Sequence, residues 1–433
     1  MLRPDPALPS RDLSWSTEQA AELFERSVLP VARPGTRLRS LERRYTAYKP
    51  GKECLLLYAL RLEPAPDDAP CLATLTLGRP ERLATLHARH YADAAGAVLL
   101  CEPPCLVEFF PSDWKLPALA HATDPGEVGA ALGSARANGA GPVEVRMLRY
   151  RPRRRCVLGY QIGSAPAAIG KVYPSAEKVA EVAAKLRALG PQARAEGLRL
   201  PVPLASAGFL LMDRVPGANL DDLLESSCDE GEARAAVRVA AASLASFHRM
   251  RLDTSETRSL ASEHRTLRER TLRMRAVAPG IGERADALLD EIGRRLARLP
   301  DGEITLIHGD FKPSQLLLDA GHAALVDLDR ACLGDPAIDL GNFLAVLGKL
   351  ALLNGRHHLA SLGPAFLDEY GAQSRRRLPR AARLFESLAL VRMVVRRLER
   401  SPHAYARQGG EWRPLRLLDA AAAGLTAQGG AHA

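Results

Sequence analysis

HGDFKPSQ at residues 308–315, VDLD at residues 326–329 and GDPAIDL at residues 334–340 are the most informative segments of the sequence. Phosphoryl transfer requires a carboxylate near the attacking hydroxyl, oxygen ligands for Mg²⁺ and cations beside the phosphates. This segment contains all three kinds of group. Residues 315–318 and 323–326, which are apolar apart from Gln315, predict two short strands, so Asp310 and Asp327 are expected at neighbouring strand ends.

The spacing of polar residues in this segment suits a metal and phosphate site. Mg²⁺ prefers hard oxygen ligands and keeps several of its waters. One carboxylate from Asp327 and one amide oxygen from Gln315 would therefore suffice beside the phosphates of a nucleotide. Lys312, two residues beyond Asp310, is placed to meet the transferred phosphoryl group.

The pattern resembles the aminoglycoside phosphotransferase and choline kinase-like family, whose members carry HGD-x-x-x-x-N, an Asp after a hairpin, and GDPxxDL. The resemblance covers roughly residues 143 to 400 and implies a bilobal protein-kinase-like fold. It implies that Asp310 is the catalytic base, that Asp327 binds the metal and that His308 braces the loop. The usual Asn of the family is Gln315 here, as in maltokinase-like members.

Residues 143–173 predict three antiparallel strands where such a fold has its N-lobe. Lys171, in the third strand, matches the lysine that holds the α- and β-phosphates of ATP. The helix expected from about Ser175 carries Glu177 and Glu181 as candidate ion-pair partners of that lysine. Of the two we prefer Glu181, which lies a full turn further into the helix.

The first hairpin of this N-lobe has no glycine-rich loop. It carries four arginines instead, Arg151, Arg153, Arg154 and Arg155. Such a run could clasp phosphates bidentately, or it could form an exposed basic hairpin, and the sequence leaves both readings open.

Residues 208–217, GFLLMDRVPG, predict a strand that ends at a Pro-Gly break. The resemblance implies that this is the hinge between the lobes. Backbone groups near Asp213 and Val215 would then meet adenine, and Met212 would flank its pocket. An ordinary strand and turn is the alternative, but the position between Lys171 and Asp310 favours the hinge.

The first 140 residues lie outside the kinase motifs and contain a repeat. YKPGKECLLLY, residues 48–58, aligns without gaps on YRPRRRCVLGY, residues 150–160, with five identities. A duplicated hairpin is the simplest account, and chance similarity is the alternative. The first copy continues through residues 72–78 but has no lysine corresponding to Lys171.

These observations predict an α+β fold with an additional sheet-containing cap. We expect the cap, a degenerate N-lobe-like unit, at residues 1–140, the N-lobe at 141–215 and a helical C-lobe at 216–433. Maltokinase-like proteins also carry a cap. Residues 255–300 are read as a charged helical insertion without chemistry of its own, and His248 as a packed structural histidine.

Composition limits the partners. The net charge of +9 comes almost entirely from Arg, without aromatic interleaving or a nucleic-acid module, so no nucleic-acid partner is expected. No stretch approaches 18 uninterrupted apolar residues and the start has no apolar leader, so no membrane partner is expected. Seven cysteines without a paired framework predict reduced thiols and a cytoplasmic location. The oligomeric state stays open.

The predicted function is the ATP- and Mg²⁺-dependent phosphorylation of a hydroxyl group on a small molecule. Only seven residues separate Asp327 from Asp335, too few for the activation segment with which a protein kinase docks a peptide. Residues 331–433 hold 14 Lys and Arg against 8 Asp and Glu, which favours a neutral or anionic acceptor such as a sugar or sugar-like alcohol. A catalytically weak pseudokinase and an aminoglycoside phosphotransferase are the alternatives.

Overall fold

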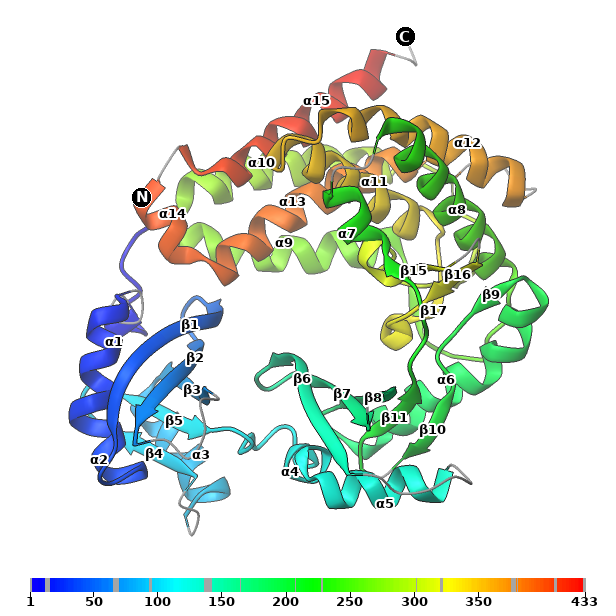
Figure 1. Cartoon of the computed structure of the whole chain (residues 1–433). Helices are drawn as coiled ribbons and strands as arrows, with labels where there is room; N and C mark the ends of the chain where they lie inside the picture. The colour runs from blue at the N-terminus through cyan, green and yellow to red at the C-terminus, as the bar shows by residue number, and fades with distance from the viewer. Residues whose placement is uncertain are drawn as a thin grey trace.

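The computed structural model describes residues 2–11, 16–64, 70–92, 96–135, 142–163, 165–206, 208–226, 229–300, 302–319, 322–374, 379, 381–408 and 411–430. Two sheet-containing parts follow one another along the first half of the chain, and a helical part makes up the second half (Figure 1). The mixture of helices and antiparallel sheets confirms the expected α+β class.

The first part is a five-stranded antiparallel sheet in the order β1-β2-β3-β5-β4. Helix α1 and the turns after it cover one face of this sheet, where the rings of Phe24 and Tyr58 meet edge to face at 5.7 Å. The elements are α1 (Thr17–Leu23), a π-helical turn (Phe24–Val28), α2 (Leu29–Ala32), β1 (Arg37–Lys49), β2 (Glu53–Glu63), β3 (Cys71–Gly78), α3 (Pro80–His90), β4 (Ala97–Leu100) and β5 (Cys105–Phe109).

The second part repeats this arrangement, with the strand order β6-β7-β8-β11-β10. In each part the third strand leads into one helix, α3 or α6, before the two remaining strands. The sheet expected within the first 140 residues is therefore present. The elements are α4 (Leu119–Thr123), α5 (Pro125–Ala135), β6 (Val143–Arg151), β7 (Arg155–Ile162), β8 (Ala165–Val172), α6 (Ala176–Ala195), β10 (Pro203–Ser206) and β11 (Leu210–Asp213).

An aspartate holds the hairpin turn in each part. Asp5 accepts hydrogen bonds from the Tyr48 hydroxyl at 2.7 Å and from the Gly51 N–H at 2.9 Å. Gly51 has a φ of 72°, the left-handed region that glycine adopts easily. This contact fixes the turn between β1 and β2.

The second turn has the same contact. Asp113 accepts from the Tyr150 hydroxyl at 2.9 Å and from the Arg153 N–H at 2.8 Å. Arg153 has a φ of 65°, in a region that residues with a Cβ seldom occupy. The two hairpins thus share their turn geometry and its aspartate as well as their sequence.

The third part is mainly helical. Its helix α11 is buried along most of its length and packs against α13, while α8 packs against α12. The helices are α7 (Leu220–Glu225), α8 (Glu230–Arg249), α9 (Leu260–Val277), α10 (Pro279–Leu296), α11 (Ala337–Leu353), α12 (Leu362–Ser374), α13 (Ala382–Arg400), α14 (Pro402–Gln408) and α15 (Arg416–Gly430), with 3-10 turns at His357–Ser361 and Arg413–Leu415.

Two small sheets carry the motif segment. One of them also includes β9, the strand that follows helix α6 of the N-lobe. Their strand orders are β12-β15-β16-β9 and β13-β17-β14. They comprise β9 (Leu198–Arg199), β12 (Ala218–Asn219), β13 (Thr257–Arg258), β14 (Thr305–Ile307), β15 (Leu316–Asp319), β16 (His322–Leu325) and β17 (Cys332–Gly334), with 3-10 turns at Pro313–Gln315 and Leu328–Arg330.

The first sheet is attached to the helical part as well as to the second sheet. Strand β1 lies against α13, and the Arg3 N–H donates to the carbonyl of Val277 at 2.7 Å. Buried residues of β2 and β3 share one apolar core with residues of α10, α13 and α15. Within the described ranges, no helix is both long and apolar enough to cross a membrane.

Candidate active site

Asp339, in the first turn of α11, holds the HGD loop. Its carboxylate accepts the backbone N–H groups of His308 at 2.6 Å, Gly309 at 2.9 Å and Phe311 at 3.3 Å. Burial alone would raise the pKa of Asp339, but His248, at 3.2 Å, and the backbone donors outweigh it and keep the pKa below its ordinary value. The loop backbone is therefore fixed by a buried, charged acceptor.

The two histidines noted in the sequence brace this arrangement. His308 is buried, and its Nε2 lies 3.0 Å from the carbonyl oxygen of Val326, which links the HGD loop to the end of the hairpin. His248 lies between Asp339 and the Tyr370 hydroxyl, the latter at 2.9 Å from its Nδ1. Both histidines are part of the packing that supports the loop.

Gly309 is required by the close approach of its neighbours. Its φ is 75°, and a Cβ at this position would lie 2.5 Å from Arg258 Nη1 and 2.6 Å from the Arg330 carbonyl oxygen. Arg258 donates to the Gly309 carbonyl at 2.6 Å and, through Nε, to Glu263 at 3.0 Å. Residues 255–300, read as an insertion without chemistry of its own, therefore contribute a contact that supports the HGD loop.

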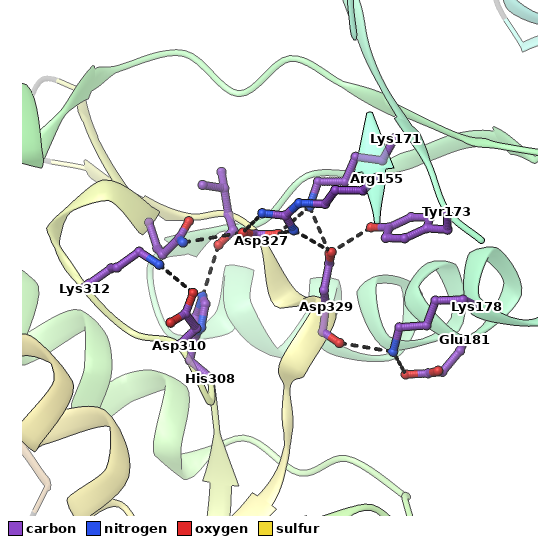
Figure 2. Close-up of polar contacts among 12 residues, drawn as sticks. Arg155, Lys171, Tyr173, Lys178, Glu181, His308, Asp310, Lys312, Asp327 and Asp329 are labelled. Atoms are coloured by element: carbon purple, nitrogen blue, oxygen red, sulfur yellow. Dashed lines mark hydrogen bonds and ion pairs between the residues drawn. The ribbon is translucent and has the colours of Figure 1, made fainter. Parts of the chain in front are cut away.

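Lys171 and Asp327 meet across the two lobes (Figure 2). Lys171 Nζ lies 2.8 Å from Asp327 Oδ1 and 2.9 Å from Asp329 Oδ1. Arg155 contacts the same two carboxylates, with Nη1 at 2.7 Å from Asp327 Oδ1 and 2.8 Å from Asp329 Oδ2. The Tyr173 hydroxyl donates to Asp329 at 2.8 Å. Two cations and two carboxylates thus form one compact cluster.

Electrostatics keep this cluster ionised. Burial would raise the pKa of Asp327, but the charges of Lys171 and Arg155 outweigh burial and lower it far below the usual range. Burial would lower the pKa of Lys171, but Asp329 and Asp327 outweigh burial and raise it. Asp327 also has a left-handed φ of 66°. Such conformations concentrate at functional sites.

Asp310 and Lys312 form a second pair beside this cluster, joined at 2.5 Å between Nζ and Oδ2 (Figure 2). Burial alone would raise the pKa of Asp310, but the charge and hydrogen bond of Lys312 outweigh it and lower the pKa. Arg396 and Arg392 lower it further. Asp310 is therefore a carboxylate at neutral pH.

Gln315 lies between these two pairs. Its amide is within 3.4 Å of Asp327 Oδ2. Turned about its last torsion, the amide donates to the Ser314 carbonyl at 3.3 Å and its oxygen accepts from Lys312 Nζ at 3.2 Å. This orientation satisfies both ends of the amide and turns an oxygen toward Asp327, which is the arrangement that a shared cation would need.

Comparison with known proteins identifies the family. A family model described as "Phosphotransferase enzyme family" matches residues 160–385, more than half of the chain. The chain belongs to this phosphotransferase family. Membership confirms the expected enzyme class, and it covers both Lys171 and the three motifs from His308 to Leu340.

A solved structure supports the fold. An assigned aminoglycoside phosphotransferase from Ralstonia eutropha JMP134 is similar over 70% of this chain and 98% of its own, with 13% identity and a TM-score of 0.51. A choline kinase from Cryptosporidium parvum Iowa II is 11% identical over 72% of this chain and 93% of its own, with a TM-score of 0.48. No curated protein matches the chain. The first likeness supports the kinase-like fold of this phosphotransferase.

Glu181 lies apart from Lys171 in this phosphotransferase. Its carboxylate contacts Lys178 Nζ at 2.7 Å and Lys185 Nζ at 2.6 Å. Among the described residues, Glu181 and Lys171 share no ion pair, contrary to the expectation from the sequence. The physical reason is competition: two lysines of its own helix flank Glu181, while Asp327 and Asp329 occupy Lys171.

The expected hinge residues lie on β11 and just beyond it. Met212 is buried in the core between the lobes, and Val215 is half-buried. The Asp213 N–H donates to the Val202 carbonyl at 3.0 Å, and its carboxylate accepts the Val202 N–H at 2.5 Å. The N–H of Asp213 is thus already engaged, which leaves its carbonyl for any contact with a base.

The four arginines of the hairpin separate into different environments. Arg155 joins the Lys171 and Asp327 cluster, whereas Arg153 turns away to Glu108 and Asp113 of the first part. Arg154 is exposed. The hairpin is therefore neither a uniform phosphate clasp nor a wholly exposed basic tip.

Three members of the site were missed in the sequence: Arg155 as an ion-pair partner, Asp329 and Tyr173. A signal existed for two of them. Tyr173 follows Lys171 by two residues, so a strand places both side chains on one face. Asp329 follows Asp327 by two residues within the quoted motif. The partner of Arg155 depends on how the lobes meet, which local sequence does not specify.

Proposed function

We propose that this protein transfers the γ-phosphate of ATP to a hydroxyl group of a small molecule. The observation that carries the proposal is the contact between Lys171 of the N-lobe and Asp327 of the C-lobe, with Asp310 and Lys312 beside it. This combines cations for phosphates with carboxylates for a metal and a hydroxyl. We further propose the division into a cap at residues 1–140, an N-lobe at 141–215 and a C-lobe at 216–433.

Lys171 is proposed to bind the α- and β-phosphates of ATP. The hairpin that carries Arg155 has no glycine-rich loop to bind phosphates. Arg155 contacts the same carboxylates as Lys171, so it is the candidate for the remaining phosphate contacts. The Asp213 carbonyl and the Val215 backbone would meet adenine, with Met212 flanking the pocket. Glu181 would support the site only through Lys178, which donates to the carbonyl of Asp329 at 3.2 Å.

Asp327 and Gln315 fit a role as Mg²⁺ ligands. In the turned orientation of Gln315, its amide oxygen lies toward the Asp327 carboxylate, and Mg²⁺ would take the rest of its shell from phosphates and water. Within the described ranges there is no group of three or more His, Cys, Asp and Glu side chains that could hold a metal without such help. When bound, Mg²⁺ would neutralise charge on the phosphates.

Asp310 is proposed to accept the proton of the acceptor hydroxyl. The hydroxyl oxygen forms a bond to the γ-phosphorus as the bond from that phosphorus to the β-phosphate oxygen breaks, which leaves ADP. Lys312, paired with Asp310, is positioned to stabilise charge on the transferred group. An ionised Asp310, with its lowered pKa, is ready to take the proton at neutral pH.

The acceptor is proposed to be a small neutral or anionic molecule, in the first place a sugar or sugar-like alcohol. The short connection from Asp327 to Asp335 supports a small acceptor, and the excess of basic residues after residue 330 disfavours a polycationic aminoglycoside. A nucleotide-binding pseudokinase is the alternative, since Gln315 replaces the usual Asn.

A coupled ADP-release assay over sugars, amino sugars and aminoglycosides tests this proposal. We expect acceptor-dependent ADP release that requires Mg²⁺ and is lost in Asp310→Asn. Binding of ATP without turnover of any acceptor would favour the pseudokinase. Turnover of kanamycin-like compounds, with neutral and anionic sugars untouched, would refute the acceptor class while leaving the chemistry intact.

A further inference from the structure

Helix α13 presents arginines toward the HGD loop. Arg392, Arg396 and Arg400 are spaced by four residues, which places them on one face of the helix. Arg392 Nη1 lies 3.1 Å from Glu263 Oε2, and Glu263 also binds Arg258, which donates to the Gly309 carbonyl. This chain of contacts places the face next to Asp310.

The N-lobe adds two more arginines. Arg149 and Arg151 are alternate residues of β6, so their side chains leave the strand on one side. Burial, followed by the charges of Arg149 and Arg400, lowers the pKa of Arg151 to about 10. The same two strand residues interact electrostatically with Tyr45 of β1. The first part, the N-lobe and α13 therefore converge on one basic region.

Four of these guanidinium groups form no hydrogen bond or ion pair within the described part of the chain. They are Arg149, Arg151, Arg396 and Arg400. The nearby carboxylates are already committed: Glu263 to Arg258 and Arg392, Glu399 to Arg270, and Asp310 to Lys312. Among the described residues, no carboxylate is therefore left to pair directly with these four arginines.

Arg396 lies on the acceptor side of the site. Burial, followed by the charge of Arg392, lowers the pKa of Arg396 to about 9, and the Asp310 carboxylate opposes this shift. Lys171, by contrast, interacts with Asp327, Asp329 and Arg155. Arg396 thus acts with Asp310, whereas Lys171 and Arg155, the cations proposed for the nucleotide phosphates, act with Asp327 and Asp329.

We propose that the acceptor carries an anionic group, a phosphate or a carboxylate, and that Arg396 and Arg400 bind this group while the acceptor hydroxyl faces Asp310. This inference rests on the proposed function and narrows its acceptor class. A guanidinium binds either anion through two parallel hydrogen bonds. An anion bound among closely spaced arginines is attracted by each of them and offsets their mutual repulsion. A neutral sugar offers no such compensation.

The test uses the full chain with Mg²⁺ and ADP. Inorganic phosphate and acetate, the probes for the two kinds of anion, are titrated into wild type, Arg396→Gln, Arg400→Gln and Arg397→Gln, with thermal unfolding as the folding control. Arg397 is exposed on the same helix and is the matched control. We expect one anion to bind, with affinity weakened about 10- to 100-fold in Arg396→Gln, as for loss of a charged hydrogen bond, and unchanged in Arg397→Gln.

A second arm compares acceptors by ADP release: glucose, glucuronate and glucose 6-phosphate. The inference predicts that one charged sugar has a kcat/KM at least about 10-fold above that of glucose, and that Arg396→Gln removes this preference. Equal use of glucose and both charged sugars, or anion binding that survives in Arg396→Gln, would overturn it. Arg396-dependent anion binding without any turnover would support the anion site and count against the proposed transfer.

Discussion

Lys171 Nζ lies 2.8 Å from Asp327 Oδ1, although the two residues are 156 positions apart in the chain. Arg155 reaches the same carboxylate from the N-lobe hairpin at 2.7 Å. A nucleotide would offer phosphates to both cations, and a metal would need the carboxylate that they now contact. In the proposed function, binding of a metal–nucleotide complex would therefore exchange partners within this cluster, because each protein group has a counterpart of opposite charge in the ligand.

Asp327→Ala should abolish Mg²⁺-dependent nucleotide binding, because the metal loses its main protein ligand. Calorimetric titration with ADP, with and without Mg²⁺, measures the effect. Asp329→Asn is the control, since Asp329 contacts the same cations but not Gln315. We expect that control to keep its Mg²⁺ dependence. Unchanged Mg-ADP affinity in Asp327→Ala would exclude a metal-binding role.

Asp310→Asn should fold normally and lose turnover by roughly 10²- to 10⁴-fold, the usual effect of removing a general base. Mg-ADP affinity should change little, because Asp310 lies beside Lys312 and not in the Lys171 cluster. The measurement is kcat with the best acceptor. The control is Asp319→Asn, at the turn of the β15–β16 hairpin, where the side chain is 43% exposed. Full activity in Asp310→Asn would rule out the assignment.

Asp339→Asn should lower the free energy of unfolding by about 3 kcal/mol at neutral pH, because a buried carboxylate with three backbone donors is replaced by an amide. The pKa of Asp339 is lowered in the folded state, so the unfolded chain binds its proton more readily. This stabilisation is present above the ordinary Asp pKa of about 3.9 and is lost as pH falls through the lowered folded value.

Denaturant unfolding of both proteins between neutral and acid pH checks this sign. The difference between wild type and Asp339→Asn should shrink as pH falls below about 4. A difference that grows toward acid pH would mean that Asp339 is not held as a charged acceptor in the folded protein.

Local pattern was enough to predict the HGD loop and its hairpin, because Asp310, Gln315 and Asp327 lie within 18 residues and their contacts follow from one turn and two strands. The kinase-like fold followed from the same segment. The repeat at residues 48–58 and 150–160 predicted the extra sheet, because a hairpin of two apolar strands around a turn of fixed length has a recognisable local sequence. These features depend on residues that are close in the chain.

Contacts between distant elements could not be predicted in the same way. The predicted pair of Glu181 with Lys171 relied on helix position alone. The actual partners of Lys171 are Asp327 and Asp329, two carboxylates of the other lobe. The basic face of α13 was visible only as a regional excess of charge, since nothing local says that Arg396 lies beside Asp310. Asp113 was missed because its partners, Tyr150 and the Arg153 N–H, follow it by some 40 residues.

Arg153 joins the two sheet-containing parts and supports the last prediction. Its guanidinium binds Glu108, which is fully buried, and lies 5.2 Å from the centre of the Trp114 ring. Arg153→Met keeps much of the apolar stem but leaves the Glu108 carboxylate buried with only the Tyr91 hydroxyl as a donor among its described contacts. Breaking one side of a buried pair costs about 3 to 5 kcal/mol.

We therefore expect the free energy of unfolding to fall by about that amount in Arg153→Met, measured by denaturant titration at neutral pH. Arg154→Met removes an equal charge from the next residue, whose side chain is exposed, and should change stability by less than about 0.5 kcal/mol. Equal, small effects in the two variants would show that the first sheet does not depend on this contact. A large effect confined to Arg153→Met would show that the N-lobe hairpin anchors the first sheet.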